Sequence, residues 1–192
     1  MAISGDAAGQ QRRHFLRNGA VLALSGTLAA SASTAAAEAA APPPLAPDVP
    51  LVLPATEFAY EAIVDIAPAV EIGEAPLGRR AMVPILGGAF AGPRIRGKVL
   101  AGGADRQLLR RDGVKLLDAL YELQADDGAI ITVRNRVLID VPADGPRYVF
   151  STLEITAPEG LHAWLNRGVF VGTLHPLMPA RQAVLIRVFR LV

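Results

Sequence analysis

The stretch VKLLDALYELQADDGAIITVRNRVLIDV, residues 114–141, decides the fold class. It contains two runs, Val114–Gln124 and Ala129–Val141, that are rich in aliphatic and β-branched residues and long enough for strands. Asp127-Gly128 lies between them, and this dipeptide tolerates the positive φ angles of a tight turn. The stretch therefore predicts an antiparallel β-hairpin.

Short β-type runs separated by turn residues continue on both sides of this hairpin. Their connections include Gly102-Gly103, Asp112-Gly113 and Asp144-Gly145-Pro146, and such short turns join antiparallel strands. One short helix is expected around Pro158–Asn166, with Pro158 at its start and Gly168 past its end. The other predicted strands are Glu57–Ile66, Arg79–Leu86, Ile95–Ala101, Arg106–Arg111, Arg147–Thr156, Gly168–Leu174 and Gln182–Leu191.

Strands of this number form either a sandwich or a closed barrel, and the successive hairpins favour the barrel. We therefore expect an all-β fold over residues 56–192, a single antiparallel up-and-down meander barrel. It should have about 8–10 strands and at most one short helix. An outer-membrane barrel is disfavoured, because the strands lack an alternating lipid-facing apolar band and aromatic residues make up only 5% of the chain.

Residues 1–37 have the three regions of a cleaved export signal. Arg12-Arg13 stands just before Phe15-Leu16, a mildly apolar run follows over residues 20–30, and small residues come next. The paired arginines resemble a twin-arginine signal, which implies recognition by the twin-arginine export machinery and a periplasmic location. Cleavage fits after Ala37 or after Ala39. The apolar run is too short to span a bilayer, so no stable membrane insertion is expected after cleavage.

The amino-acid composition limits which structures and functions are compatible with the chain. Residues 38–55 are rich in Ala and Pro and predict an extended linker ahead of the barrel. The 192 residues carry 19 Lys and Arg against 18 Asp and Glu, a balance that excludes a broadly basic nucleic-acid binder. Cysteine is absent, which excludes disulfides, thiolate metal sites and cysteine nucleophiles.

The segment GGAFAGPRIRGKVLAGGAD, residues 87–105, resembles the domain of unknown function 3237, also called uncharacterised protein family 0311. Members commonly carry an aromatic residue where this chain has Arg106, and an arginine where it has Leu120. The resemblance covers residues 50–192 and implies a small antiparallel β-barrel, often a homo-oligomer, without a generally assigned reaction. The other segments that agree are Arg111–Gly113, Leu117–Tyr121, Asp127–Ile131 and Trp164–Arg167.

The chain lacks the residue patterns of several common active sites. Ser151 lies in a β-type run without a nucleophile elbow, so we interpret it as structural. His162 and His175 do not have metal-ligand spacing, and no metal is expected. Of the two, His175 is the better candidate for an acid–base histidine. The glycines match no dinucleotide or phosphate-loop pattern, so no cofactor is expected.

Three residues are candidates for catalysis: Asp118, Tyr121 and Asp105. Asp118 lies between Leu116 and Leu120 on one face of an apolar strand, and Tyr121 lies on the other face. A carboxylate on an apolar face needs a partner or a solvated cavity, so Asp118 is either a general base or the partner of an arginine such as Arg94 or Arg111. Asp105 is either a turn residue or a ligand contact, whereas Asp112 and Asp127 are interpreted as turn residues.

Four residues are candidates for ligand binding: Arg94, Trp164, Asn166 and Phe90. The aromatic residues would line an apolar pocket, with Arg94 and Asn166 as its polar contacts. The leading hypothesis is an exported barrel that binds a small, partly apolar molecule. If it is an enzyme, its residues suit non-covalent acid–base chemistry of the isomerase, cyclase or lactone-hydrolase type. The alternatives are a non-catalytic binding protein and an oligomerising structural module.

Overall fold

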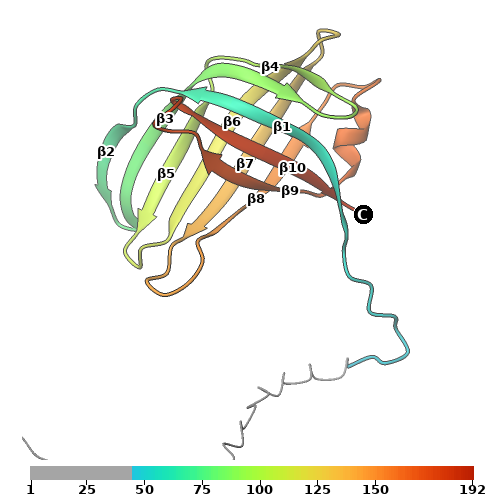
Figure 1. Cartoon of the computed structure of the whole chain (residues 1–192), viewed down its shortest axis with the longest axis horizontal. Coiled ribbons are helices and arrows are strands. Elements are labelled where there is room, and N and C mark those ends of the chain that lie inside the picture. Colours follow the sequence, from blue (N-terminus) through green and yellow to red (C-terminus); the bar gives the residue numbers. More distant parts are fainter. Residues whose placement is uncertain (1–44) are drawn as a thin grey trace, which may run out of the picture. The chain divides into compact units, whose positions relative to one another are not determined.

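The computed structural model describes residues 45–192 and shows an all-β chain with one short 3-10 helix (Figure 1). This confirms the expected fold class. The predicted short helix is present as the 3-10 helix η1, Ala163–Arg167, which ends before Gly168 as expected but begins after His162 rather than at Pro158. The strands are β1 Thr56–Ile66, β2 Val70–Ala75, β3 Gly78–Ala91, β4 Arg96–Val99, β5 Ala104–Arg110, β6 Lys115–Ala125, β7 Ile130–Asp140, β8 Tyr148–Thr156, β9 Phe170–Pro176 and β10 Ala183–Leu191.

The ten strands occupy eight positions around a closed antiparallel barrel. β1 and β2 follow one another along the same side of β3, and β4 and β5 follow one another between β3 and β6. β6 to β10 then pair in sequence order, and the barrel closes where β10 pairs with β1, from Thr56 opposite Leu191 to Asp65 opposite Ala183. The successive-hairpin topology predicted from the turns is therefore present.

Strand β2 was not among the predicted strands. Its sequence alternates only briefly before Gly73, where φ is +109° and the pairing with β3 shifts register. Such a bulge interrupts the period-2 pattern on which strand prediction depends. β3 is also longer than predicted and continues through the glycine-rich residues 87–91.

The inward face of the barrel is set by alternation along β7. Ile131, Val133, Asn135 and Val137 are buried, while Arg134 and Arg136 between them face outward. One end of the interior is filled by aromatic and aliphatic side chains, including Tyr60, Phe90, Phe170 and Leu165 of η1. The other end is less completely filled. Within residues 45–192, no helix has the length and apolar character needed to cross a membrane.

Candidate binding cavity

A cavity of about 380 Å³ occupies the less filled end of the barrel. Its volume lies within the range of small-molecule sites, about 300–1,000 Å³. The wall is mostly aliphatic, with Val64, Ile85, Leu117, Val137 and Ile186 among its residues. The polar side chains on it are Asp105, Gln107, Lys115, Tyr121, Asn135, Arg147 and Gln182.

Asp105 is the carboxylate of this cavity. Gln107, two residues later on the same face of β5, donates a hydrogen bond from Nε2 to Oδ2 at 2.6 Å. The other oxygen, Oδ1, is buried and has no hydrogen-bond partner among the described residues. Burial raises the pKa of Asp105 above its ordinary value, and the hydrogen bond from Gln107 and the charge of Lys115 offset only part of the rise. A carboxylate in this state suits proton transfer.

Two further polar groups in the cavity lack partners. Asn135 is 1% exposed, and its Oδ1 has no hydrogen-bond partner within the described chain. The Tyr121 hydroxyl is likewise buried and unpartnered, and burial raises the pKa of this phenol above its ordinary value, so it stays a neutral donor. Because buried polar groups in native proteins are nearly always hydrogen-bonded, we interpret these atoms as contacts for a bound molecule or for water.

The strand register places these groups at neighbouring levels of the wall. Asp105 on β5 is opposite Ala119 on β6, and Ala119 is in turn opposite Asn135 on β7. Ala119 has only a methyl group, so the space between Asp105 and Asn135 stays open. Tyr121 is two residues farther along the same face of β6. Gly103 approaches Tyr121 so closely that a Cβ there would lie 2.6 Å from the tyrosine Cβ.

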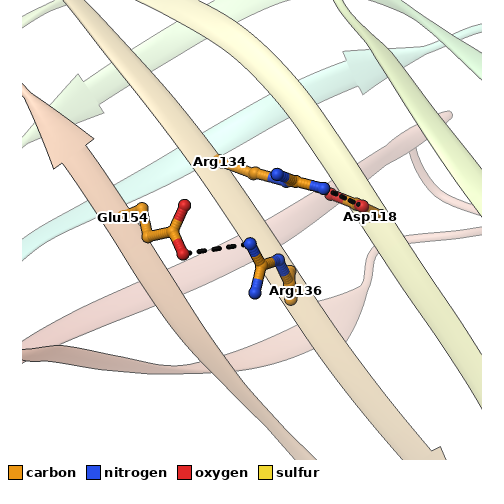
Figure 2. Close-up of polar contacts among 4 residues, drawn as sticks. All are labelled: Asp118, Arg134, Arg136 and Glu154. Carbon is orange, nitrogen blue, oxygen red and sulfur yellow. Dashed lines mark hydrogen bonds and ion pairs between the residues drawn. The ribbon is translucent and has the colours of Figure 1, made fainter.

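Asp118 lies outside this cavity, on the outer surface of the barrel (Figure 2). Arg134 on β7 donates two hydrogen bonds to it, from Nε to Oδ1 at 2.9 Å and from Nη2 to Oδ2 at 2.7 Å. This pairing lowers the pKa of Asp118 below its ordinary value. The neighbouring Arg136 bonds Glu154 at 3.0 Å. The arginine partner of Asp118 is thus Arg134, whereas the sequence had pointed to Arg94 or Arg111.

The four expected ligand-binding residues lie at the opposite end of the barrel, and none of them lines the cavity. The Arg94 guanidinium stacks over the Trp164 ring at 4.3 Å, beside a separate hollow of about 310 Å³. Phe90 is buried and packs edge-on against Tyr60, with ring centroids 5.7 Å apart. The structure therefore brings Arg94 and Trp164 together but keeps them apart from Asp105 and Tyr121.

Asn166 of η1 bonds the backbone of Ala157. Its Oδ1 accepts from the Ala157 N–H at 2.8 Å, and its Nδ2 donates to the Ala157 carbonyl at 2.9 Å. We predict that Asn166→Ala lowers the free energy of unfolding by about 1–3 kcal/mol, since two part-buried hydrogen bonds are lost. Urea denaturation measures this effect. The affinity of the cavity for an apolar probe should stay unchanged, and a large loss of affinity would contradict the structural role.

The histidines and the remaining candidates have local roles. Asp127 accepts a hydrogen bond from the Ala129 N–H at 3.1 Å, as a turn residue does, and its other oxygen is 3.0 Å from Nε2 of the buried His162. His175 is exposed on β9. Ser151 is buried beside Gly172, and its hydroxyl has no hydrogen-bond partner, histidine or other, in the described chain. In residues 45–192, no three His, Asp or Glu side chains gather as they would around a metal ion.

Sequence reasoning missed Asn135, Gln107, Lys115 and Arg147 as cavity residues. For Asn135 a signal was present: it is the one polar residue in the series Ile131, Val133, Asn135, Val137 and Ile139, which forms one face of β7. A polar side chain on an apolar strand face indicates either a buried hydrogen bond or a site. Arg147 lies in the loop before β8, where no periodicity indicates direction.

Together these features define a class of protein: a small up-and-down antiparallel barrel with a hollow, mostly apolar end. The chain belongs to the family described as "Protein of unknown function (DUF3237)", whose model matches residues 54–191. This confirms the family resemblance that the sequence segments indicated.

Similar proteins agree with this assignment. A UPF0311 protein of Clostridium acetobutylicum is 33% identical over 135 residues, which cover 60% of this chain and 84% of that protein. A UPF0311 protein of Rhodopseudomonas palustris (strain TIE-1) is 39% identical over 133 residues, covering 62% and 86%. The crystal structure of a β-barrel-like protein from Acinetobacter baumannii has a TM-score of 0.65 at 28% identity, covering 74% of this chain and all of that one.

Proposed function

We propose that this protein binds a small, partly apolar molecule in the barrel cavity and catalyses a proton transfer on it. The observation that carries the proposal is the group of unpartnered buried atoms, Asp105 Oδ1, Asn135 Oδ1 and the Tyr121 hydroxyl, on a mostly aliphatic wall. Polar atoms of this kind in an apolar pocket are typical of ligand sites. Their chemistry suits a carbonyl compound.

In the proposed reaction, Asp105 is the general base. Its Oδ1 takes a proton from the carbon next to the ligand carbonyl, and the C–H electron pair moves to form an enolate. The Tyr121 hydroxyl donates a hydrogen bond to the developing oxyanion, and the Asn135 amide is available as a second polar contact. Return of the proton to the same or another atom completes exchange or isomerisation. The raised pKa of Asp105 brings the base closer to neutral pH than an ordinary aspartate.

Deuterium exchange tests the chemistry without knowledge of the natural substrate. The purified protein is incubated with 2-tetralone, a compact apolar ketone, in D₂O, and loss of the α-proton signals is followed by NMR. We expect exchange above the buffer rate, a loss of about 10²-fold or more of this excess in Asp105→Asn, and a smaller loss in Tyr121→Phe. Asp118→Asn is the matched control and should exchange at the wild-type rate.

Binding is measured separately with N-phenyl-1-naphthylamine, a neutral dye that fluoresces in apolar surroundings. We expect saturable binding that is weakened in Ala119→Leu, which fills the space between Asp105 and Asn135. Cavity-dependent binding without exchange would overturn the catalytic part and leave a binding protein. No saturable binding would overturn both parts.

We also propose that the chain is exported by the twin-arginine route to the periplasm. Support comes from the order of residues 1–37, with Arg12-Arg13 before the apolar run, and from the absence of cysteine, so that a folded barrel needs no periplasmic oxidation. Replacing Arg12-Arg13 with a lysine pair should leave the protein in the cytoplasmic fraction as the longer precursor. Unchanged fractionation would contradict this route.

A further inference from the structure

The charge on the cavity wall is unbalanced. The lining contains one carboxylate, Asp105, and two basic side chains, Lys115 and Arg147. Neither base is in an ion pair within the described chain, whereas Arg134, Arg136, Arg181 and Arg187 on the outer surface each bond a carboxylate. Because two basic side chains face one carboxylate, the cavity lining carries an excess of positive charge.

The two bases lie at the opening, and the proton-transfer groups lie deeper. Lys115 is the first residue of β6, and Arg147 directly precedes β8. Along the inward face of β6, Lys115 is followed by Leu117, Ala119 and Tyr121. At about 3.3 Å per residue, Lys115 and Ala119 are about 13 Å apart along the strand. Leu117 and Val137 are the apolar part of the wall between these levels, and the polar side chain there, Gln107, is bonded to Asp105.

This order of groups matches one class of ligand. An ammonium and a guanidinium recognise a carboxylate or a similar anion through charge-assisted hydrogen bonds. The aliphatic wall accommodates an apolar body, and Asp105, Asn135 and Tyr121 meet a carbonyl or hydroxyl group at the far end of it. A neutral ligand would leave Arg147 without an ion-pair partner in the described chain and Lys115 with only the charge of Asp105 nearby.

We infer that the natural ligand is an amphipathic organic anion, with its acidic head held by Lys115 and Arg147 at the opening and its apolar body directed toward Asp105. This inference rests on the proposed function, since it names the class of molecule that the cavity takes. It also assigns Lys115 and Arg147 as residues that determine specificity rather than residues that transfer protons.

Two dyes with the same apolar body test the inference. 8-Anilinonaphthalene-1-sulfonate is N-phenyl-1-naphthylamine with an added sulfonate, and both are titrated against the full protein by fluorescence. The double variant Lys115→Gln, Arg147→Gln should bind the sulfonate dye at least about tenfold more weakly, as expected for lost charge-assisted contacts. Its affinity for the neutral dye should change less than about twofold. Lys98→Gln, at the exposed lysine of β4, removes one positive charge elsewhere and should change neither.

The outcomes separate this inference from the proposed function. If the double variant loses affinity equally for both dyes, or for neither, the anionic-head assignment is wrong while cavity binding stands. Ala119→Leu and a second variant, Val137→Phe, fill the cavity. If both variants bind both dyes as tightly as the wild type, the proposed site itself is wrong. Unchanged near-ultraviolet circular dichroism of each variant ensures that dye binding reports the folded barrel, because the sulfonate dye also binds loosely packed states.

Discussion

Asp105→Asn stabilises the barrel at neutral pH while it removes the proposed base. The carboxylate of Asp105 is partly buried, and its Oδ1 has no partner in the described chain, so the charged form destabilises the folded state. Asparagine has nearly the same shape and keeps a carbonyl oxygen to accept the hydrogen bond of Gln107. We expect a gain on the order of 1 kcal/mol, which raises the unfolding midpoint by about 3–5 °C.

The gain should depend on pH in a defined direction. Because the pKa of Asp105 is raised in the folded state, the folded protein holds this proton at pH values where the unfolded chain has lost it. The contribution of this group to stability therefore falls as pH rises from about 4 through the folded-state pKa, and it stays low above it. The advantage of Asp105→Asn should be absent below about pH 4 and should grow with pH.

Thermal unfolding of the wild type and Asp105→Asn across this pH range measures the effect. Asp118→Asn is the matched control, since the same atoms change on the outer surface. Arg134 lowers the pKa of Asp118, so loss of the Asp118 carboxylate should destabilise the folded state slightly. The expected effect is less than about 1 kcal/mol, because the ion pair is exposed. Were Asp105→Asn less stable than the wild type at every pH, Asp105 would be a structural residue rather than a strained functional one.

The fold was predictable because turns and strands agreed along most of the chain. The Asp127-Gly128 hairpin, the other short turns and the successive β-type runs led to a closed meander, and the structure has it. β2 escaped detection because Gly73 interrupts its alternation. The closure of β1 on β10 pairs residues more than a hundred positions apart, which no local pattern specifies.

The site was harder to predict because β6 is apolar on both faces. Its sequence places Asp118 on one face and Tyr121 on the other, and a shift of one residue exchanges them. The next strand resolves the direction: one face of β7 is apolar except for Asn135, and the register sets Val133 opposite Tyr121 and Arg136 opposite Asp118. Residues directly opposite each other in a hairpin point to the same side of the sheet. Applying this rule from β7 to β6 would have predicted Tyr121 inside the barrel and Asp118 outside it.

Gly88→Ala is expected to destabilise the barrel more than any of the other substitutions. Gly88 lies on β3 with φ +141°, a conformation that residues with a side chain rarely adopt. An added Cβ would lie 2.0 Å from the Ile63 carbonyl oxygen and 3.2 Å from the Val64 Cα, both backbone atoms of β1. Backbone in a paired strand cannot rotate away, so β1 must separate from β3. We expect a loss of more than about 4 kcal/mol, a large part of a typical domain's stability.

Gly102→Ala provides the control that separates strain from collision. Gly102 also has a positive φ, +108°, but no atom lies within 4 Å of an added Cβ. The loss of unfolding free energy that urea denaturation measures for Gly102→Ala should therefore reflect backbone strain alone, about 1–3 kcal/mol. Equal losses of stability in the two variants would show that the close approach of β1 to β3 at Gly88 does not restrict the side chain there. A much larger loss in Gly88→Ala would show that the barrel depends on this close approach, and with it the cavity, because Val64 of β1 is part of the cavity wall.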